Sequence, residues 1–403
     1  MLLAIIYLTF ISLGLPDSAL GSAWPSMYGE LGAGISWQGV ISAIICAGTI
    51  LSSVFSTSIV RRLGTGRTTT FSVALTAAAL LGFSTVHEFW QLCLLAVPYG
   101  LGAGAIDAAL NSYAAVHFAA RHMSWLHCMW GVGASAGPII MSWRLSGGGT
   151  WHDGFASIGA IQLAITVALV ASLSLWRRDA AVEGTRGDQP REATAPARSR
   201  RELLAIPGVK QTLICFFCYT ALESTCGAWA ASYGTLARGI DAGAAASWAS
   251  LFFIGITVGR LASGFLTLRL SDKQLIRLGQ ALIGAGLVLI ALPLPTACAT
   301  AGLVACGVGC APIYPSILHG TPGYFGRESA LALTGLQMAV AYVGSLVMSP
   351  LFGVLAQAVT PALYPAYLGA LLVVMVWMAE GVNRTVAARA DQASGAGAEK
   401  TVS

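Results

Sequence analysis

The sequence predicts an all-α membrane protein with twelve transmembrane helices arranged as two pseudo-repeats of six. Of its 403 residues, 56% are hydrophobic and only 10% are charged, whereas a soluble domain carries about 25% charged residues. Because about 20 apolar residues span a bilayer, charge-poor stretches of that length predict spanning helices. Twelve such stretches occur, at 3–28, 36–60, 68–86, 90–117, 123–144, 154–176, 207–235, 244–268, 275–293, 296–319, 327–354 and 361–381.

The first stretch is interpreted as a retained helix rather than a cleaved signal peptide. It has no basic flank and no obvious small-residue cleavage site, and it contains Pro16, Asp17 and Pro25. A signal peptide is shorter and more uniformly apolar. We therefore count this stretch as the first span.

A polar segment at 177–206, rich in charged residues, Pro, Ser and Gly, separates the sixth and seventh stretches and predicts a flexible linker. The expected organisation is a six-helix bundle at 1–176, this linker, a second bundle at 207–381 and a tail at 382–403. Nearly all of the 22 Lys and Arg residues fall on one side of the predicted spans. The positive-inside rule then places both termini and the linker in the cytoplasm of a multi-pass plasma (inner) membrane protein.

The two halves resemble each other. D-S-A-L-G-S-A-W-P-S-M-Y-G begins at Asp17, and the similar E-S-T-C-G-A-W-A-A-S-Y-G begins at Glu223. The fourth and tenth stretches also share G-x-G, at 102–104 and 307–309. These matches lie at a nearly constant offset, which indicates a duplicated six-helix unit. Two such halves around a midplane site are typical of secondary transporters.

Three acids lie inside apolar stretches: Asp17, Asp107 and Glu223. A charge in hydrocarbon is costly, so such acids usually face a pathway. Loss of water around a carboxylate favours its protonated form, which suits proton coupling. We predict Asp107 as the main proton site and Asp17 and Glu223 as further proton-coupling residues. The alternative is that each acid makes a structural hydrogen bond between helices.

Polar and aromatic side chains in the stretches predict substrate contacts. Asp107 and Asn111 are four residues apart and share a helix face, as do His127 and Trp130, which are three apart. Aromatic faces stack on sugars, and amide and imidazole groups bond to their hydroxyls. The predicted substrate-binding residues are Asn111, His127, Trp130, Trp24, Trp229, Gln337 and Tyr342. For each aromatic residue, the alternative is helix packing or an interfacial belt.

Two further features are a pair of opposite charges within helices and a position where a helix could bend. Glu223 and Arg260 form an opposite-sign pair well inside the predicted helices of the second half. They could pair with each other, or Arg260 could reach a backbone carbonyl or the membrane interface. Gly137 and Pro138 would weaken the fifth helix locally, as a gating element requires, although small residues equally serve close helix packing.

Several classes of protein lack their motifs here. There is no P-loop, G-x-S-x-G or H-E-x-x-H motif, so neither nucleotide-driven pumping nor hydrolase chemistry is expected. Cys215 and Cys218 form a C-x-x-C inside an apolar helix without a second pair nearby, which favours packing over metal binding. We therefore expect no enzyme activity, no cofactor, no metal and no nucleic-acid partner.

These features together resemble the major facilitator superfamily over the whole chain. The loop R-R-L-G-T-G-R at 61–67 resembles the superfamily's G-x-x-x-D-R-x-G-R motif, and 264–271 is similar to its second copy. The resemblance implies structural or gating roles for Arg62 and Arg269, and a structural or gating role is also predicted for Arg260 as a cation within a span.

Within the superfamily, W-L-H-C-M-W-G-V-G-A-S-A-G-P at 125–138 resembles the segment-five signature of the fucose permease-like sugar–proton symporters. This resemblance implies that Asp17 and Asp107 are proton and sugar carboxylates and that His127 and Trp130 face the sugar. The predicted function is proton-coupled uptake of a sugar or polyol by a monomer in the lipid bilayer. Two alternatives remain: an antiporter that exports an amphipathic compound, and a membrane sensor that transports nothing.

Overall fold

A computed structural model describes residues 2–117, 120–183 and 200–402, and within these ranges the chain forms helices and no strands. The N-terminal half contains α1 (Leu2–Gly14), α2 (Ala19–Met27), α3 (Trp37–Leu63), α4 (Thr65–Phe83), α5 (Phe89–His117), α6 (Ala120–Ser146) and α7 (Trp151–Glu183). The C-terminal half contains α8 (Arg200–Ala205), α9 (Val209–Arg238), α10 (Ala242–Ala246), α11 (Trp248–Leu266), α12 (Asp272–Ala291), α13 (Thr296–Phe325), α14 (Arg327–Ala358), a 3-10 turn η1 (Pro361–Leu363) and α15 (Tyr364–Val402).

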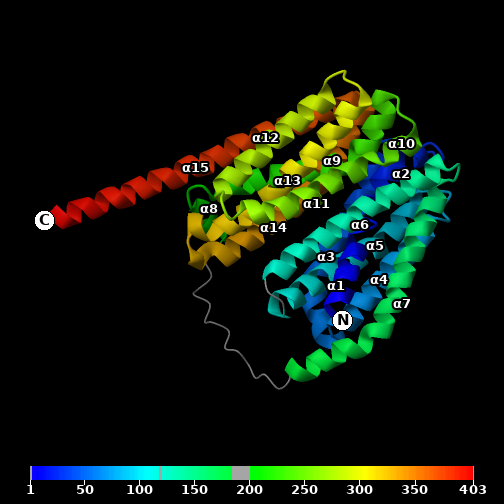
Figure 1. Cartoon of the computed structure of the whole chain (residues 1–403), viewed down its shortest axis with the longest axis horizontal. Helices are drawn as coiled ribbons and strands as arrows, with labels where there is room; N and C mark the ends of the chain where they lie inside the picture. The colour runs from blue at the N-terminus through cyan, green and yellow to red at the C-terminus, as the bar shows by residue number, and fades with distance from the viewer. Residues whose placement is uncertain (1, 118–119, 184–199, 403) are drawn as a thin grey trace.

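The predicted all-α membrane fold is confirmed. Each of the twelve predicted stretches coincides with a long helix or with two consecutive helices. By length and composition, ten segments of the described chain qualify as spans. The two remaining predicted stretches are α4 and α6, which run beside the others in the bundle although their first turns are polar (Figure 1).

The first span is broken near its middle, because residues 15–18 form turns between α1 and α2. Pro16 carries no N–H group and so cannot continue the helical hydrogen-bond ladder. The turn instead has Asp17 N donating to Gly14 O at 3.1 Å and Ala19 N donating to Pro16 O at 3.1 Å. Asp17 therefore lies at a break inside the bundle rather than on a regular helix.

Close backbone contacts join α1 to α6. A Cβ atom on Gly14 would lie 2.0 Å from Trp130 O, and one on Gly137 would lie 2.1 Å from Leu15 O. Such approaches require glycine, because the neighbouring atoms belong to the backbone. Pro138 lies within α6, which continues to Ser146 without a break. Gly137 thus serves close packing here, and its predicted gating role stays a prediction.

The two halves meet at the end opposite the linker and diverge toward the linker end (Figure 1). Gln38 Nε2 donates to Ala228 O at 2.9 Å, and Ser36 Oγ donates to Gln357 Oε1 at 2.6 Å. A Cβ on Gly21 would lie 2.5 Å from Ala228 O, so α2 packs directly against α9. The described contacts therefore join the halves at one end and near the centre.

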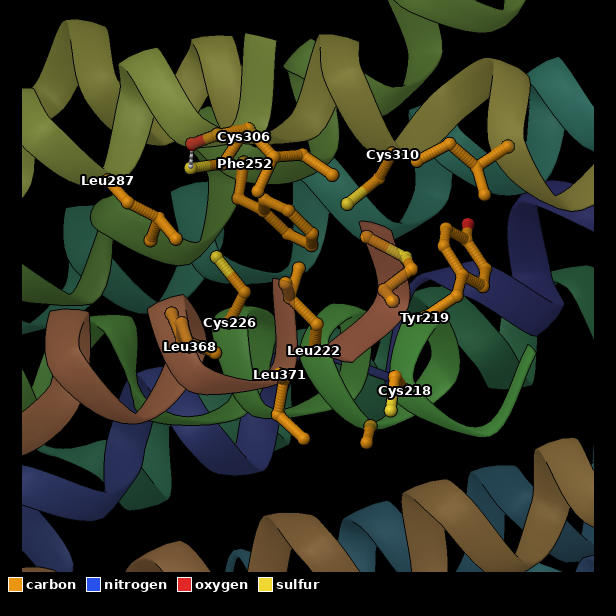
Figure 2. Packing of buried hydrophobic residues seen from close by; sticks show 14 of the residues in the cluster. Cys218, Tyr219, Leu222, Cys226, Phe252, Leu287, Cys306, Cys310, Leu368 and Leu371 are labelled. Atoms are coloured by element: carbon orange, nitrogen blue, oxygen red, sulfur yellow. Dashed lines mark hydrogen bonds between the residues drawn. The ribbon is translucent and has the colours of Figure 1, made fainter. Parts of the chain in front are cut away.

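The core of the C-terminal half contains several cysteines, shown in Figure 2. Cys226 on α9 and Cys306 and Cys310 on α13 are buried around Phe252, and all nine cysteines are free thiols. Cys306 Sγ donates to Ile283 O at 3.7 Å. The thiols act here as small packing side chains.

The boundaries of the predicted linker and tail differ from the helix boundaries. Helix α7 extends to Glu183 and α8 occupies Arg200–Ala205, so both ends of the predicted linker are helical, while 184–199 lies outside the described residues. The predicted tail continues α15 as a helix to Val402.

An ion pair joins α12 to α15 in the C-terminal half. Arg277 on α12 makes two hydrogen bonds of 2.6 Å to the carboxylate of Glu380 on α15.

Candidate functional site

Asp17 is held at the helix break by side chains from two other helices. Its Oδ2 accepts a hydrogen bond of 2.8 Å from Trp130 Nε1 on α6, and its Oδ1 accepts one of 3.5 Å from the Tyr99 hydroxyl on α5. The Asp17 side chain nevertheless stays exposed. A carboxylate that accepts hydrogen bonds from neutral donors and remains accessible can bind and release a proton without a rearrangement of the side chains around it.

The indole of Trp130 joins Asp17 to the other half of the protein. The Arg260 guanidinium carbon on α11 lies 5.0 Å from the Trp130 ring centroid, and the Phe253 ring packs edge-on at 5.9 Å. A cation over an aromatic face is attracted by the ring quadrupole. Arg260 Nη1 also donates to the His127 carbonyl at 3.5 Å. A carboxylate of one half is thus connected through one indole to a cation of the other.

Glu223 on α9 belongs, like Arg260, to the C-terminal half of the protein. Glu223 interacts electrostatically with Arg260 and also with Tyr219, which lies one helical turn before it on α9. Among the ion pairs of the described residues, none within 4.0 Å includes Arg260. Of the alternatives that the sequence left open, the structure has Arg260 reaching a backbone carbonyl, with Glu223 as a more distant electrostatic partner.

A second polar group centres on Asp107. Asn111 Nδ2 donates to Asp107 Oδ1 at 2.7 Å, one turn away on α5. The Asn111 Oδ1 atom is buried and accepts no hydrogen bond from the described residues. Tyr314 on α13 and Tyr342 on α14 both interact electrostatically with Asp107, and so does Asp17. The two polar groups therefore influence each other's charge, and tyrosines of the C-terminal half interact with Asp107.

Three predicted substrate-binding residues lie in helix packing instead. Trp24 and Trp229 are almost completely buried and donate to the carbonyls of Ile35 and Ser349 at 2.8 and 3.0 Å. Gln337 is buried and donates to a threonine hydroxyl on α13 at 2.9 Å. Since their polar atoms already have partners, the structure does not bring these side chains to the acidic groups.

The other predicted residues lie at the surfaces where the two halves face each other or move apart toward the linker end. The His127 side chain is exposed, and its ring packs edge-on against Phe10 at 5.9 Å. Trp130 is three residues further along the same face of α6. Arg260 lies over the Trp130 ring and interacts electrostatically with His127. Arg62 and Arg269 are exposed at equivalent positions, in the last turn of α3 and just after α11.

Sequence reasoning missed three tyrosines: Tyr99, Tyr219 and Tyr314. Tyr219 precedes Glu223 by four residues, so helical spacing alone could have paired them. Tyr99 and Tyr314 contact residues of other helices, and no pattern within their own segments marks them. They add hydroxyl groups to a site that was expected to rest on amides, imidazole and indoles.

Trp130→Phe separates the two contacts of the indole. The variant keeps a ring for Arg260 and removes the Nε1 donor to Asp17. Because a hydrogen bond to a charged group contributes about 1.5–3 kcal/mol, we expect the proton-coupled uptake predicted from the sequence to fall roughly tenfold or more in liposomes. Trp143→Phe, at an exposed tryptophan of the same helix, is the matched control. Equal rates in both variants would contradict a role for the Trp130–Asp17 bond.

The bundle of two similar six-helix halves around a central polar site defines the class of membrane transporters with a pseudo-repeat. The model of the Major Facilitator Superfamily matches residues 6–330, and the chain belongs to this superfamily. It is therefore a multi-pass membrane protein of a family of transporters that move small molecules.

The comparisons with individual proteins are more distant. The chain is similar to the structure of the nucleoside transporter NupG, with a TM-score of 0.70, 12% identity and coverage of 94% of this chain and 98% of that one. It is also similar to the structure of the peptide transporter POT, with a TM-score of 0.73, 13% identity and coverage of 95% and 94%. At these identities the likeness concerns the fold alone, and both are transporters rather than enzymes.

One curated relative is Bypass of stop codon protein 6 of Saccharomyces cerevisiae. It is 23% identical over 284 residues, which cover 66% of this chain and 56% of that protein. The chain thus spans about half the length of this relative.

Proposed function

We propose that this protein is a proton-coupled secondary transporter that takes up a sugar or similar polyol by alternating access. The observation that carries the proposal is the connection from Asp17 through Trp130 to Arg260, which joins a proton-binding group of one half to a cation of the other. Asp107 is the main proton site in this proposal, and Asp17 assists.

Protonation can change this connection in a defined way. A charged carboxylate accepts a stronger hydrogen bond than a neutral carboxyl group, so a proton on Asp17 weakens its bond to the Trp130 indole. The indole ring is also the surface on which Arg260 lies. A proton bound in one half therefore alters a contact between the halves, and such a difference between two states is what coupling requires.

The two neighbouring acids of the N-terminal half support the same mechanism. Asp17 and Asp107 repel each other when both are ionised. A proton on either one relieves this repulsion. Loading with a proton thus stabilises the arrangement in which these two acids lie close together.

The arrangement of charges and contacts supports a state of the carrier that is open toward the cytoplasm. The basic residues that follow α3 and α11 lie at the linker end, which the positive-inside rule assigns to the cytoplasm of the inner membrane. The contacts between Ser36 and Gln357 and between Gln38 and Ala228 close the opposite end. In this proposal the described state is open to the cytoplasm, and the monomer is the working unit.

The test uses purified protein in liposomes that hold a pH-sensitive dye, with single sugars and polyols added outside. We expect internal acidification that depends on one substrate and on the protein. A folded protein that moves no protons with any of them would overturn the proposal. Proton exit in exchange for an amphipathic compound would instead identify an exporter.

A further inference from the structure

Arg260 has more hydrogen-bond donors than partners. A guanidinium group carries five N–H donors, and the described hydrogen bond of Arg260 is a single long one to the His127 carbonyl, at 3.5 Å. Its other close contact is the face of Trp130. The side chain is half-buried at the contact between the halves, where an incompletely paired cation is costly.

Asn111 has the opposite deficit. Its amide nitrogen is used by Asp107 Oδ1, at 2.7 Å, while its Oδ1 is buried without a partner. A buried acceptor without a donor costs about 1–3 kcal/mol. The bond to Asp107 also fixes which amide atom is available, because the nitrogen must face the carboxylate. What is missing at Asn111 is therefore a donor, such as a hydroxyl group.

Tyr314 connects these two positions electrostatically. Its phenol interacts with Asp107, which bonds to Asn111, and also with Arg260. Its hydroxyl donates to Met338 Sδ at 3.2 Å, and a thioether is a weak acceptor. The half-buried Tyr314 side chain is thus influenced both by the cation and by the acid of the acid–amide pair.

We propose that the substrate is a polyhydroxylated monocarboxylate, that is, a sugar acid, whose carboxylate binds Arg260 and one of whose hydroxyls donates to Asn111 Oδ1. Trp130 would provide the flat wall between these two contacts. The inference rests on the proposed function and narrows its substrate class from neutral sugars to their acids.

The shape and charge of the groups around the site favour a monocarboxylate over a phosphate. The planar guanidinium fork matches a carboxylate or a phosphate. Against the single Arg260 stand three acids, Asp17, Asp107 and Glu223, so a dianionic phosphate would be repelled more strongly than a monoanion. A proton taken up with a monocarboxylate also leaves the charge of the loaded carrier unchanged.

The test compares matched pairs that differ only at C6: glucose with glucuronate, and galactose with galacturonate. Binding to the detergent-purified protein is measured by calorimetry, and proton-coupled uptake is measured in liposomes. We expect at least one uronate to bind at least tenfold more tightly than its hexose. Arg260→Gln should remove this preference, while Arg260→Lys should keep part of it, because a point charge remains without the fork.

Lys210→Gln is the matched control, since it removes the same charge from an exposed position at the start of α9 and should leave the preference intact. If hexoses bind and drive proton uptake as well as uronates, the inference is overturned while the proposed function stands. If neither member of any pair binds or moves protons, the proposed function fails as well. If Arg260→Gln does not fold, the inference is tested by the preference for uronates over hexoses in the unmodified protein and in Arg260→Lys.

Discussion

Asp107→Asn is expected to abolish accumulation of substrate against its gradient while the protein stays folded. The new amide has nearly the shape of the carboxyl group, and its oxygen can still accept the hydrogen bond from Asn111 Nδ2. It cannot bind the coupling proton. The carrier would then only equilibrate its substrate, with an inside-to-outside ratio of about one.

The measurement is uptake of labelled substrate into liposomes with an imposed proton gradient, together with exchange at equal substrate concentrations. We expect accumulation to disappear and exchange to continue. Asp153→Asn is the control. Asp153 lies in the first turn of α7, where its carboxylate accepts hydrogen bonds from Thr150, and it is not one of the candidate site residues. Accumulation at the normal level in Asp107→Asn would show that another group carries the proton.

Gly14→Ala is expected to have the largest effect on stability. The added Cβ would lie 2.0 Å from Trp130 O and 2.8 Å from Ala134 N, and backbone atoms cannot move aside by changing rotamer. Helix α1 must therefore shift away from α6. Overpacking of this kind costs about 1–3 kcal/mol or more, and the shift would also lengthen the hydrogen bond between Trp130 and Asp17.

Thermal unfolding can be followed with a dye that reacts with newly exposed thiols, because Cys226, Cys306 and Cys310 are buried in the folded protein. We expect a lower unfolding temperature for Gly14→Ala and no decrease for Gly369→Ala on α15, where a Cβ would meet nothing within 4 Å. Equal unfolding temperatures would mean that α1 and α6 do not pack as closely as described.

The helices could be predicted well from the sequence, since the bilayer requires a minimum apolar length and few other structures satisfy the backbone within it. The break in the first span was harder to predict. Pro16 marked it, but Pro25 in the same stretch stays inside the regular helix α2. Proline usually disrupts the interior of a helix, yet α2 continues past Pro25 to Met27. The presence of a proline alone therefore does not locate the break.

The candidate site was predicted in part. Asp17 and Arg260 were selected because charged groups are rare within spans, and Trp130 because an aromatic face can stack on a sugar; the structure brings the three together. Trp24 and Trp229 were selected by residue type alone. Whether an indole faces the centre or its own bundle depends on the rotation of its helix, which neighbouring helices determine. The contact of Tyr99 with Asp17 likewise depends on alignment between helices far apart in sequence.

The broken first span attaches to both halves of the protein. Its first piece, α1, is packed against α6 through Gly14, whereas its second piece, α2, touches α9 of the other half through Gly21. Rotation of one half against the other thus pulls the two pieces in different directions, and the turn at 15–18 is where the backbone dihedral angles can absorb this motion. Asp17 belongs to that turn. We therefore expect movement of the halves to change the position of the Asp17 carboxylate directly, because the backbone of Asp17 itself bends.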